Sequence, residues 1–132
     1  MKLSANMEDY LEAVSFCADT NGVARVSDIR DMLGVKTPSV TGAMKALAQA
    51  GYVSHEPYKG IVLTAKGRRA AEDVKKRHAI LSRFLTQVLG VNPKTADMDA
   101  CKMEHAVSKE TLEKLHAYLH KIGEGPYGTS KE

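Results

Sequence analysis

Residues 27–64, SDIRDMLGVKTPSVTGAMKALAQAGYVSHEPYKGIVLT, change from one periodicity to another along their length. Apolar residues spaced three and four apart predict a short helix over 27–33 and a second helix from Thr37 to Gly51. Next, β-branched and aromatic residues on both sides of a Tyr58-Lys59-Gly60 turn predict a β-hairpin. A helix, a three-residue turn, a second helix and a hairpin, in this order, are the arrangement of a winged helix-turn-helix.

Short polar side chains and one proline mark the starts of these two helices. We expect Ser27 to cap the first helix and Thr37 to cap the second. Pro38 suits the first turn of the second helix, where its missing N–H is not needed. The turn Gly34-Val35-Lys36 lets the helices cross, so that the second one can enter the major groove of DNA.

Further helices are predicted on both sides of this unit. The spacing of apolar residues predicts one helix over residues 5–21 and three more over residues 64–89, 92–106 and 108–122. The fold class is therefore mainly α, a winged helix-turn-helix followed by an all-helical region. We expect the Gly-rich, polar residues 123–132 to form a flexible tail.

The composition limits the compartment of the protein. Hydrophobic residues make up 43% of the 132 residues, which is enough for a core, but no apolar stretch is long enough to span a membrane. The acidic N-terminal region does not resemble a signal peptide. Two cysteines, Cys17 and Cys101, do not form a disulfide framework. We expect a cytoplasmic protein with no membrane partner.

The positive charges are concentrated in one part of the chain. The formal net charge is only +3, but residues 25–70 carry eight basic groups against the acidic Asp28, Asp31 and Glu56. On a winged helix this excess predicts binding to the phosphates of double-stranded DNA. The alternatives are that the lysines only solubilise the surface, or that the winged helix contacts protein. The candidate DNA-binding residues are Arg25, Lys36, Thr37, Pro38, Ser39, Thr41, Lys45 and Lys59.

A second group of residues suits a transition metal. His78 lies in the apolar stripe of the helix at 64–89, and Cys101, Glu104 and His105 share one face of the next helix. Asp9 and Glu12 border the apolar stripe of the first helix. Together these side chains offer nitrogen, oxygen and sulfur ligands for first-row transition metals. We therefore consider Asp9, Glu12, His78, Cys101, Glu104 and His105 as candidate metal ligands.

Each of these residues also has a simpler interpretation. A histidine in an apolar stripe is often a hydrogen-bonded core residue, and acids near a helix start complement the helix dipole. Glu104 and His105 can be ordinary surface groups. His116 and His120 lie four apart on the last helix beside its apolar face, and we interpret them as boundary residues, not as ligands.

Six segments in a fixed order connect the chain to a known family. MEDYLEAV, ARVSDI, PSVT, YKGIVLTAKG, KKRHAIL and ACKMEH make residues 5–122 resemble the diphtheria toxin repressor family, most closely its short two-domain manganese-transport regulators. The resemblance implies a homodimeric, metal-activated transcriptional repressor that controls genes of iron or manganese homeostasis and binds a palindromic DNA operator. It also implies a winged helix-turn-helix DNA-binding domain over residues 1–70 and an all-helical metal-binding and dimerisation domain over residues 71–122. It also places all six candidate ligands on ligand positions of the family.

The chain departs from the family at several of these positions. Manganese-type members carry a carboxylate in place of Cys101, and iron-type members carry Met in place of Asp9. A thiolate favours Fe(II), Co(II) or Zn(II), whereas the carboxylates favour Mn(II). The expected cofactor is Fe(II) or Mn(II), with Co(II) or Zn(II) as substitutes in vitro. Ser82 replaces a carboxylate of an ancillary site, and Gly42 replaces a longer polar residue in the recognition helix.

The expected mechanism is a metal-dependent clamp between the first helix and the dimerisation domain. One rival function is a metal-independent winged-helix regulator that senses oxidants or small molecules through Cys101. The other is a metallohydrolase, which needs an open coordination position, a substrate pocket and a general base. Nothing near the candidate ligands resembles a nucleophile motif, so we do not expect an enzyme.

Overall fold

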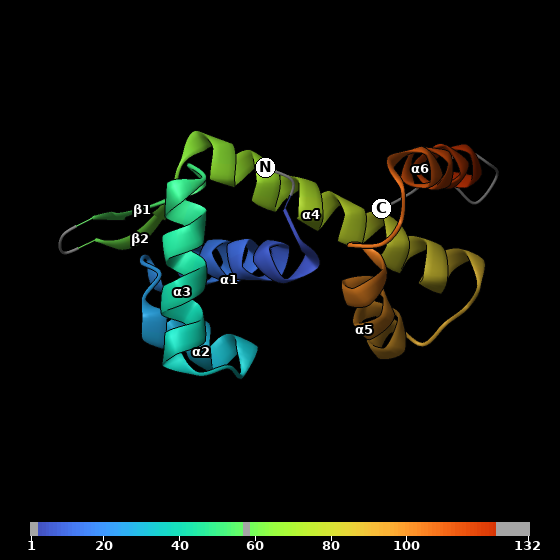
Figure 1. Ribbon diagram of the computed structural model, residues 1–132. Helices are drawn as coiled ribbons and strands as arrows, with labels where there is room; N and C mark the ends of the chain where they lie inside the picture. Colours follow the sequence, from blue (N-terminus) through green and yellow to red (C-terminus); the bar gives the residue numbers. More distant parts are fainter. Residues whose placement is uncertain (1–2, 57–58, 124–132) are drawn as a thin grey trace. The chain divides into compact units, whose positions relative to one another are not determined.

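The structure is a computed structural model, which describes residues 3–56 and 59–123 in two compact units that divide after Val74 (Figure 1). The first unit contains α1 (Ala5–Asn21), α2 (Val26–Leu33), α3 (Thr37–Gln49), β1 (Val53–Glu56), β2 (Gly60–Leu63) and the start of α4 (Ala65–Arg83). The second unit contains the rest of α4, the π-helical turn η1 (Phe84–Val88), α5 (Pro93–Met103) and α6 (Lys109–Gly123). The mainly α class and the winged helix-turn-helix are thus confirmed.

The wing is a two-stranded antiparallel sheet. Its register runs from Val53 opposite Leu63 to Glu56 opposite Gly60. Ile61 also pairs with Ala24, the residue that leads into α2, so the wing is joined to the helix-turn-helix by its backbone. Tyr58 of the predicted turn lies outside the described residues.

The predicted helix caps were wrong by one or two residues. α2 begins at Val26 with Arg25 at the cap position, and α3 begins at Thr37 with Lys36 at the cap position. Both cap residues have an extended backbone, and neither makes a side-chain cap hydrogen bond. Their carbonyls accept the first helical hydrogen bonds, from Ile29 and Val40 respectively, so Thr37 already lies inside its helix.

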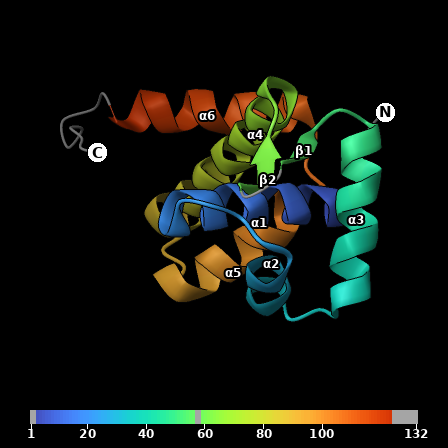
Figure 2. The same ribbon diagram turned by 90° about the vertical axis from the view of Figure 1, so that its left-hand side faces the viewer.

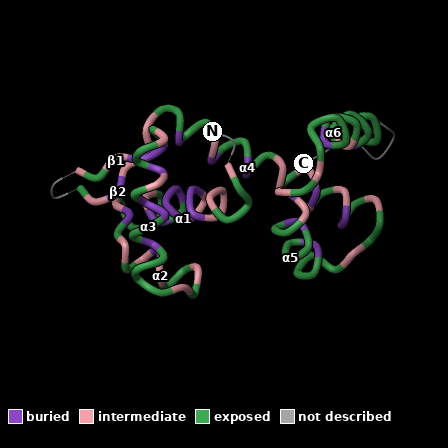
Figure 3. Tube along the Cα trace, in the orientation of Figure 1, coloured by how far each residue is buried: buried purple, intermediate pink, exposed green. Residues whose placement is uncertain are grey.

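The core of the first unit joins its helices to the wing. In Figure 3 the buried positions gather on the inner faces of α1 and α3. On α3, Val40, Met44 and Leu47 are buried, and α1 contributes Leu11 and Val14 with no exposed surface. The remaining central residues come from α2 and from both strands: Ile29, Val53 and Ile61. One apolar cluster therefore fixes the orientation of α3 within this unit.

The second unit has a smaller core of Leu81, Ala100 and Leu112. The helix predicted over residues 64–89 is α-helical only to Arg83 and then widens into η1, where the Thr86 hydroxyl donates to the carbonyl of Ser82 (3.0 Å). Ser108 starts α6 as predicted, since its hydroxyl accepts from the backbone N–H of Thr111 (3.1 Å). The predicted tail lies beyond Gly123, outside the described residues. In the described ranges, no helix is both long and apolar enough to cross a membrane.

Gly67 allows α4 to start against the end of α3. It is buried, its N–H donates to the Thr64 hydroxyl (3.0 Å), and a Cβ at this position would collide with the carbonyl of Tyr52. Because that carbonyl also accepts from the Thr64 N–H and hydroxyl, it has little room to move. We expect Gly67→Ala to lower the free energy of unfolding by about 1–3 kcal/mol, the usual cost of overpacking.

A matched substitution on α3 should have the opposite effect. A Cβ at Gly42 meets no atom within 4 Å, so Gly42→Ala should gain about 0.5–1 kcal/mol from helix propensity. Urea unfolding monitored by circular dichroism measures both variants. Equal stabilities for the two would contradict the close packing at Gly67.

Candidate metal centre and DNA-binding surface

Helix α3 lies next to the wing in the first unit (Figure 2), and one face of this helix is polar and exposed. Its opposite face buries Val40, Ala43, Met44 and Leu47, so the exposed residues cannot turn inward. Arg30 on α2 donates a hydrogen bond to the Thr37 hydroxyl (3.3 Å), which joins the two helices at this surface. All the sequence-predicted DNA-binding residues are exposed: Arg25, Lys36, Thr37, Pro38, Ser39, Thr41, Lys45 and Lys59.

The second unit contains a buried carboxylate beside two imidazoles. Glu104 has no exposed surface, although it follows the last residue of α5. One carboxylate oxygen lies 2.8 Å from Nδ1 of His78, and the other lies 3.5 Å from Nε2 of His105. The Arg77 guanidinium donates to the Glu104 carbonyl (2.7 Å). A buried carboxylate is costly unless cations and hydrogen bonds compensate it, and here it is the two imidazoles that approach the carboxylate oxygens, since Arg77 donates to the backbone carbonyl.

Helix α5 ends earlier than predicted, yet its ligand face is retained. The predicted helix ran to residue 106, whereas α5 ends at Met103. Glu104 keeps a helical backbone, and its N–H donates to the carbonyl of Ala100 (2.9 Å). The Glu104 side chain therefore still projects toward His78 on α4.

Asp97 is a neighbour that the sequence did not single out. Its Oδ1 lies 2.7 Å from Nε2 of His78, so the imidazole lies between two carboxylates. The ligand atoms of His78, Asp97 and Cys101 lie within 4.8 Å of one another, and Cys101 is exposed. The four-residue spacing of Asp97 and Cys101, which places them on one helix face, was the available signal.

The surroundings of His78 favour a positive charge at this position. Partial burial lowers the pKa of His78, but the hydrogen bonds and charges of Asp97 and Glu104 outweigh burial and raise the pKa above its usual value. The same two carboxylates favour any cation held between them. Nitrogen, oxygen and sulfur donors in one cluster fit a first-row divalent ion, whereas Mg²⁺ and Ca²⁺ prefer oxygen alone.

The remaining sequence candidates come from two other helices, α1 and α6. Asp9 and Glu12 lie on α1 in the first unit, three residues apart. His116 and His120 are exposed on α6. In the described part of the second unit, the structure thus brings together His78, Cys101, Glu104 and His105, and it adds Asp97.

Two family models match the chain in sequence. The model described as "Iron dependent repressor, N-terminal DNA binding domain" matches residues 2–61, and "Iron dependent repressor, metal binding and dimerisation domain" matches residues 64–131. An uncharacterised HTH-type transcriptional regulator of Methanocaldococcus jannaschii is 39% identical over 91% of this chain and 97% of its own length. The transcriptional regulator MntR of Escherichia coli O157:H7 is 40% identical over 89% of this chain and 75% of its own length.

Solved structures of regulators share the fold. The manganese regulator SloR matches with a TM-score of 0.78 and 25% identity over 91% of this chain. A manganese-dependent transcriptional repressor in complex with manganese matches with a TM-score of 0.75 and 27% identity over 86% of this chain. The chain spans about half the length of these two structures, 55% and 52% respectively.

Proposed function

Because this chain belongs to the iron dependent repressor family, we propose that a divalent metal, Fe(II) or Mn(II), sets its affinity for an operator that controls genes of metal homeostasis. The observation that carries the proposal is the buried Glu104 carboxylate with His78 and His105 beside it. Asp97 and Cys101 form a second group with His78, in which a carboxylate, a thiol and an imidazole have ligand atoms within 4.8 Å of one another. We propose a regulatory role for this site and no catalytic one.

Asp9 and Glu12 are proposed to complete the ligand set. This part of the proposal rests on the sequence resemblance, which places both residues on family ligand positions. They lie on α1, whose Leu11 and Val14 belong to the same core as α2 and α3. A bound metal ion would supply the positive charge that balances the negative charges of these carboxylates. In the proposed ligand set, mutual repulsion of the carboxylates of Asp9, Glu12 and Glu104 would loosen α1 when no metal is bound.

The second unit is proposed to place two copies of α3 on one operator. On α6, Tyr118 and Ile122 are four residues apart and 46% and 37% exposed, so both present apolar surface on one face of the helix. A homodimer would cover such a face. Its two recognition helices would then lie about one DNA turn apart, roughly 34 Å, and the operator would be palindromic.

A DNA titration tests the metal switch. A duplex selected from a random pool in the presence of Mn(II) is titrated with protein in Mn(II), in anaerobic Fe(II) and in chelator. A coupling of about 1–3 kcal/mol predicts 5- to 150-fold tighter binding with metal. Glu12→Gln should lose most of this difference, whereas Glu8→Gln on the same helix should keep it. Equal affinities of the wild-type protein in metal and in chelator would overturn the proposal.

A further inference from the structure

A small cavity lies at the base of the wing, within the first unit. Its volume is about 240 Å³, which is below the roughly 300 Å³ at which pockets for drug-sized molecules begin. The lining residues are Ala24, Arg25, Val26, His55, Gly60 and Ile61. A cavity of this size suits a small group, such as one phosphate, better than a whole metabolite.

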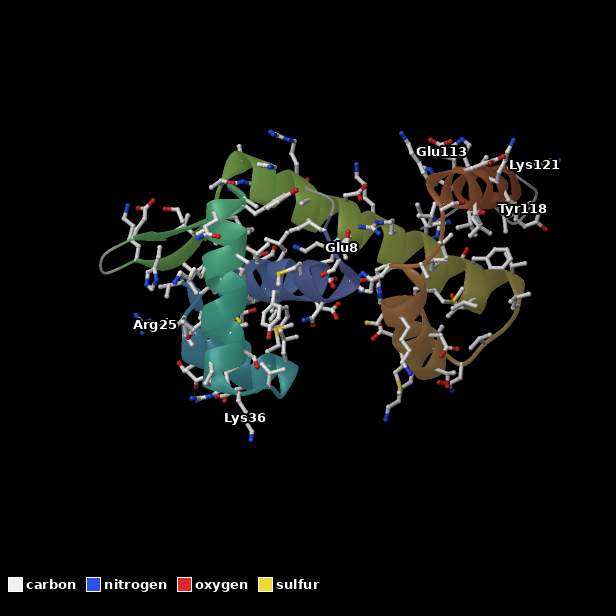
Figure 4. All side chains as sticks on the ribbon, in the orientation of Figure 1. Glu8, Arg25, Lys36, Glu113, Tyr118 and Lys121 are labelled. Carbon is white, nitrogen blue, oxygen red and sulfur yellow. The ribbon has the colours of Figure 1, made fainter. Side chains whose placement is uncertain are left out.

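The polar side chains of the cavity are a guanidinium and an imidazole. Arg25 and His55 are both exposed, and none of the described carboxylates is among the residues that line the cavity. In the ranges 3–56 and 59–123, no hydrogen bond or ion pair connects either side chain to another residue. Figure 4 shows that Arg25 extends outward below the hairpin, on the side to which the wing projects. Both side chains can therefore donate to an anion that approaches from solvent.

The walls of this cavity are held by backbone contacts. The Ile61 N–H donates to the Ala24 carbonyl (2.8 Å), which joins β2 to the residue before Arg25. Gly60 has a positive φ of 76°, and a Cβ there would come within 2.6 Å of the same carbonyl. Arg25 and His55 come from segments thirty residues apart, yet this contact holds their backbones together. Preorganised donors of this kind lose little entropy when they bind.

We propose that the cavity between Arg25 and His55 holds one backbone phosphate of the bound DNA. The inference rests on the DNA binding in the proposed function. It adds the group of the DNA that this cavity recognises, which is a backbone phosphate. The Arg25 guanidinium donates to two phosphate oxygens, and an N–H of the His55 ring donates to one of them. The contact positions the wing along the duplex and is independent of the base sequence.

A double-mutant cycle, which combines protein variants with modified DNA duplexes, tests the proposed phosphate contact. Single phosphates of the selected duplex are replaced, one at a time, by uncharged methylphosphonates. For the wild-type protein, we expect one position in each half-site to cost about tenfold in affinity, the effect of a lost charge-assisted hydrogen bond. Arg25→Gln and His55→Gln should weaken binding to the unmodified duplex and become insensitive to that position. For Arg25→Gln, the slope of the logarithm of the binding constant against the logarithm of the salt concentration should become less steep. The change should be about one for each cavity that holds a phosphate in the wild-type complex.

One control variant and three alternative outcomes complete the test. Lys114→Gln, which removes an exposed charge from α6, should keep the wild-type sensitivity to every methylphosphonate. If Arg25→Gln and the sensitive methylphosphonate weaken binding additively, the cavity does not hold that phosphate, although the metal switch stands. If inorganic phosphate shifts the His55 ring signals while no methylphosphonate matters, the cavity is an anion site unrelated to DNA. If the wild-type protein binds no duplex, the proposed function itself fails.

Discussion

Replacing Glu104 by Gln is expected to abolish the metal dependence of DNA binding. The carboxylate is fully buried and lies beside His78 and His105, so its charge is the largest electrostatic attraction for a cation at this point. An amide keeps the shape and still accepts a hydrogen bond from the His78 ring, but it has no charge. The 5- to 150-fold difference between metal and chelator should therefore fall to about one.

The same substitution should leave the protein folded. Replacing the buried carboxylate by a neutral amide removes the cost of desolvating its charge, but it also removes the charge that pairs with His78, so we expect only a modest change in the stability of the metal-free protein. Titration of duplex with and without Mn(II), together with thermal unfolding in chelator, measures both properties. Glu113→Gln on α6 is the matched control, because Glu113 is exposed and lies outside the cluster (Figure 4). Metal dependence that survived in Glu104→Gln would contradict the role of the buried carboxylate.

Replacing Cys101 by Ser is expected to change which metal the protein prefers. Cys101 is exposed, and its sulfur lies within 4.8 Å of the ligand atoms of His78 and Asp97. Thiolates favour Zn(II), Co(II) and Fe(II), whereas Mn(II) prefers carboxylates. Substitution of residues that only hydrogen-bond to metal ligands lowers metal affinity by about 10–100-fold. Because a thiolate would bind the metal directly, its loss should lower the affinity for Zn(II) at least tenfold. Mn(II) should be affected much less.

Cobalt provides a direct readout of the thiolate. The Co(II) complex of the wild-type protein should show thiolate-to-metal charge-transfer absorption, and Cys101→Ser should lose it. Cys17→Ala is the control, because Cys17 is buried in the first unit, where burial, followed by the charge of Asp28, raises the pKa of its thiol. An unchanged cobalt spectrum in Cys101→Ser would exclude Cys101 as a ligand. Loss of redox response without any change in metal preference would favour the oxidant-sensing alternative.

Local patterns predicted most of the fold. The helix-turn-helix followed from apolar spacings and from glycines such as Gly34, which ends α2 with a left-handed backbone. The hairpin followed from β-branched residues around a turn. The errors occurred at element ends: Ser27 and Thr37 have the side chains of caps, but the chain becomes helical one or two residues earlier, after Arg25 and Lys36. The preference of a residue type for the cap position contributes little free energy, so tertiary packing easily shifts the first residue of a helix.

The ligand cluster was predictable only in part. Cys101, Glu104 and His105 were recognised because helical spacing places them on one face, and that face survives although α5 ends at Met103. Asp97 has the same spacing from Cys101, but only its 2.7 Å contact with His78 distinguishes it from other exposed acids. Spacing along one helix gives the shared face, and it does not give the partner that packs against that face.

By itself, the sequence determined the winged helix-turn-helix, the positive charge of its surface and the types of ligand atom that the chain offers to a metal. These properties depend on residues that are close in the chain, where spacing and turn chemistry decide the outcome. Only the tertiary structure decided that His78 lies between Asp97 and Glu104, and that Arg25 and His55 line one cavity beside the wing. These pairs are 19, 26 and 30 residues apart. Contacts over such distances depend on how packed elements meet, which no local pattern encodes.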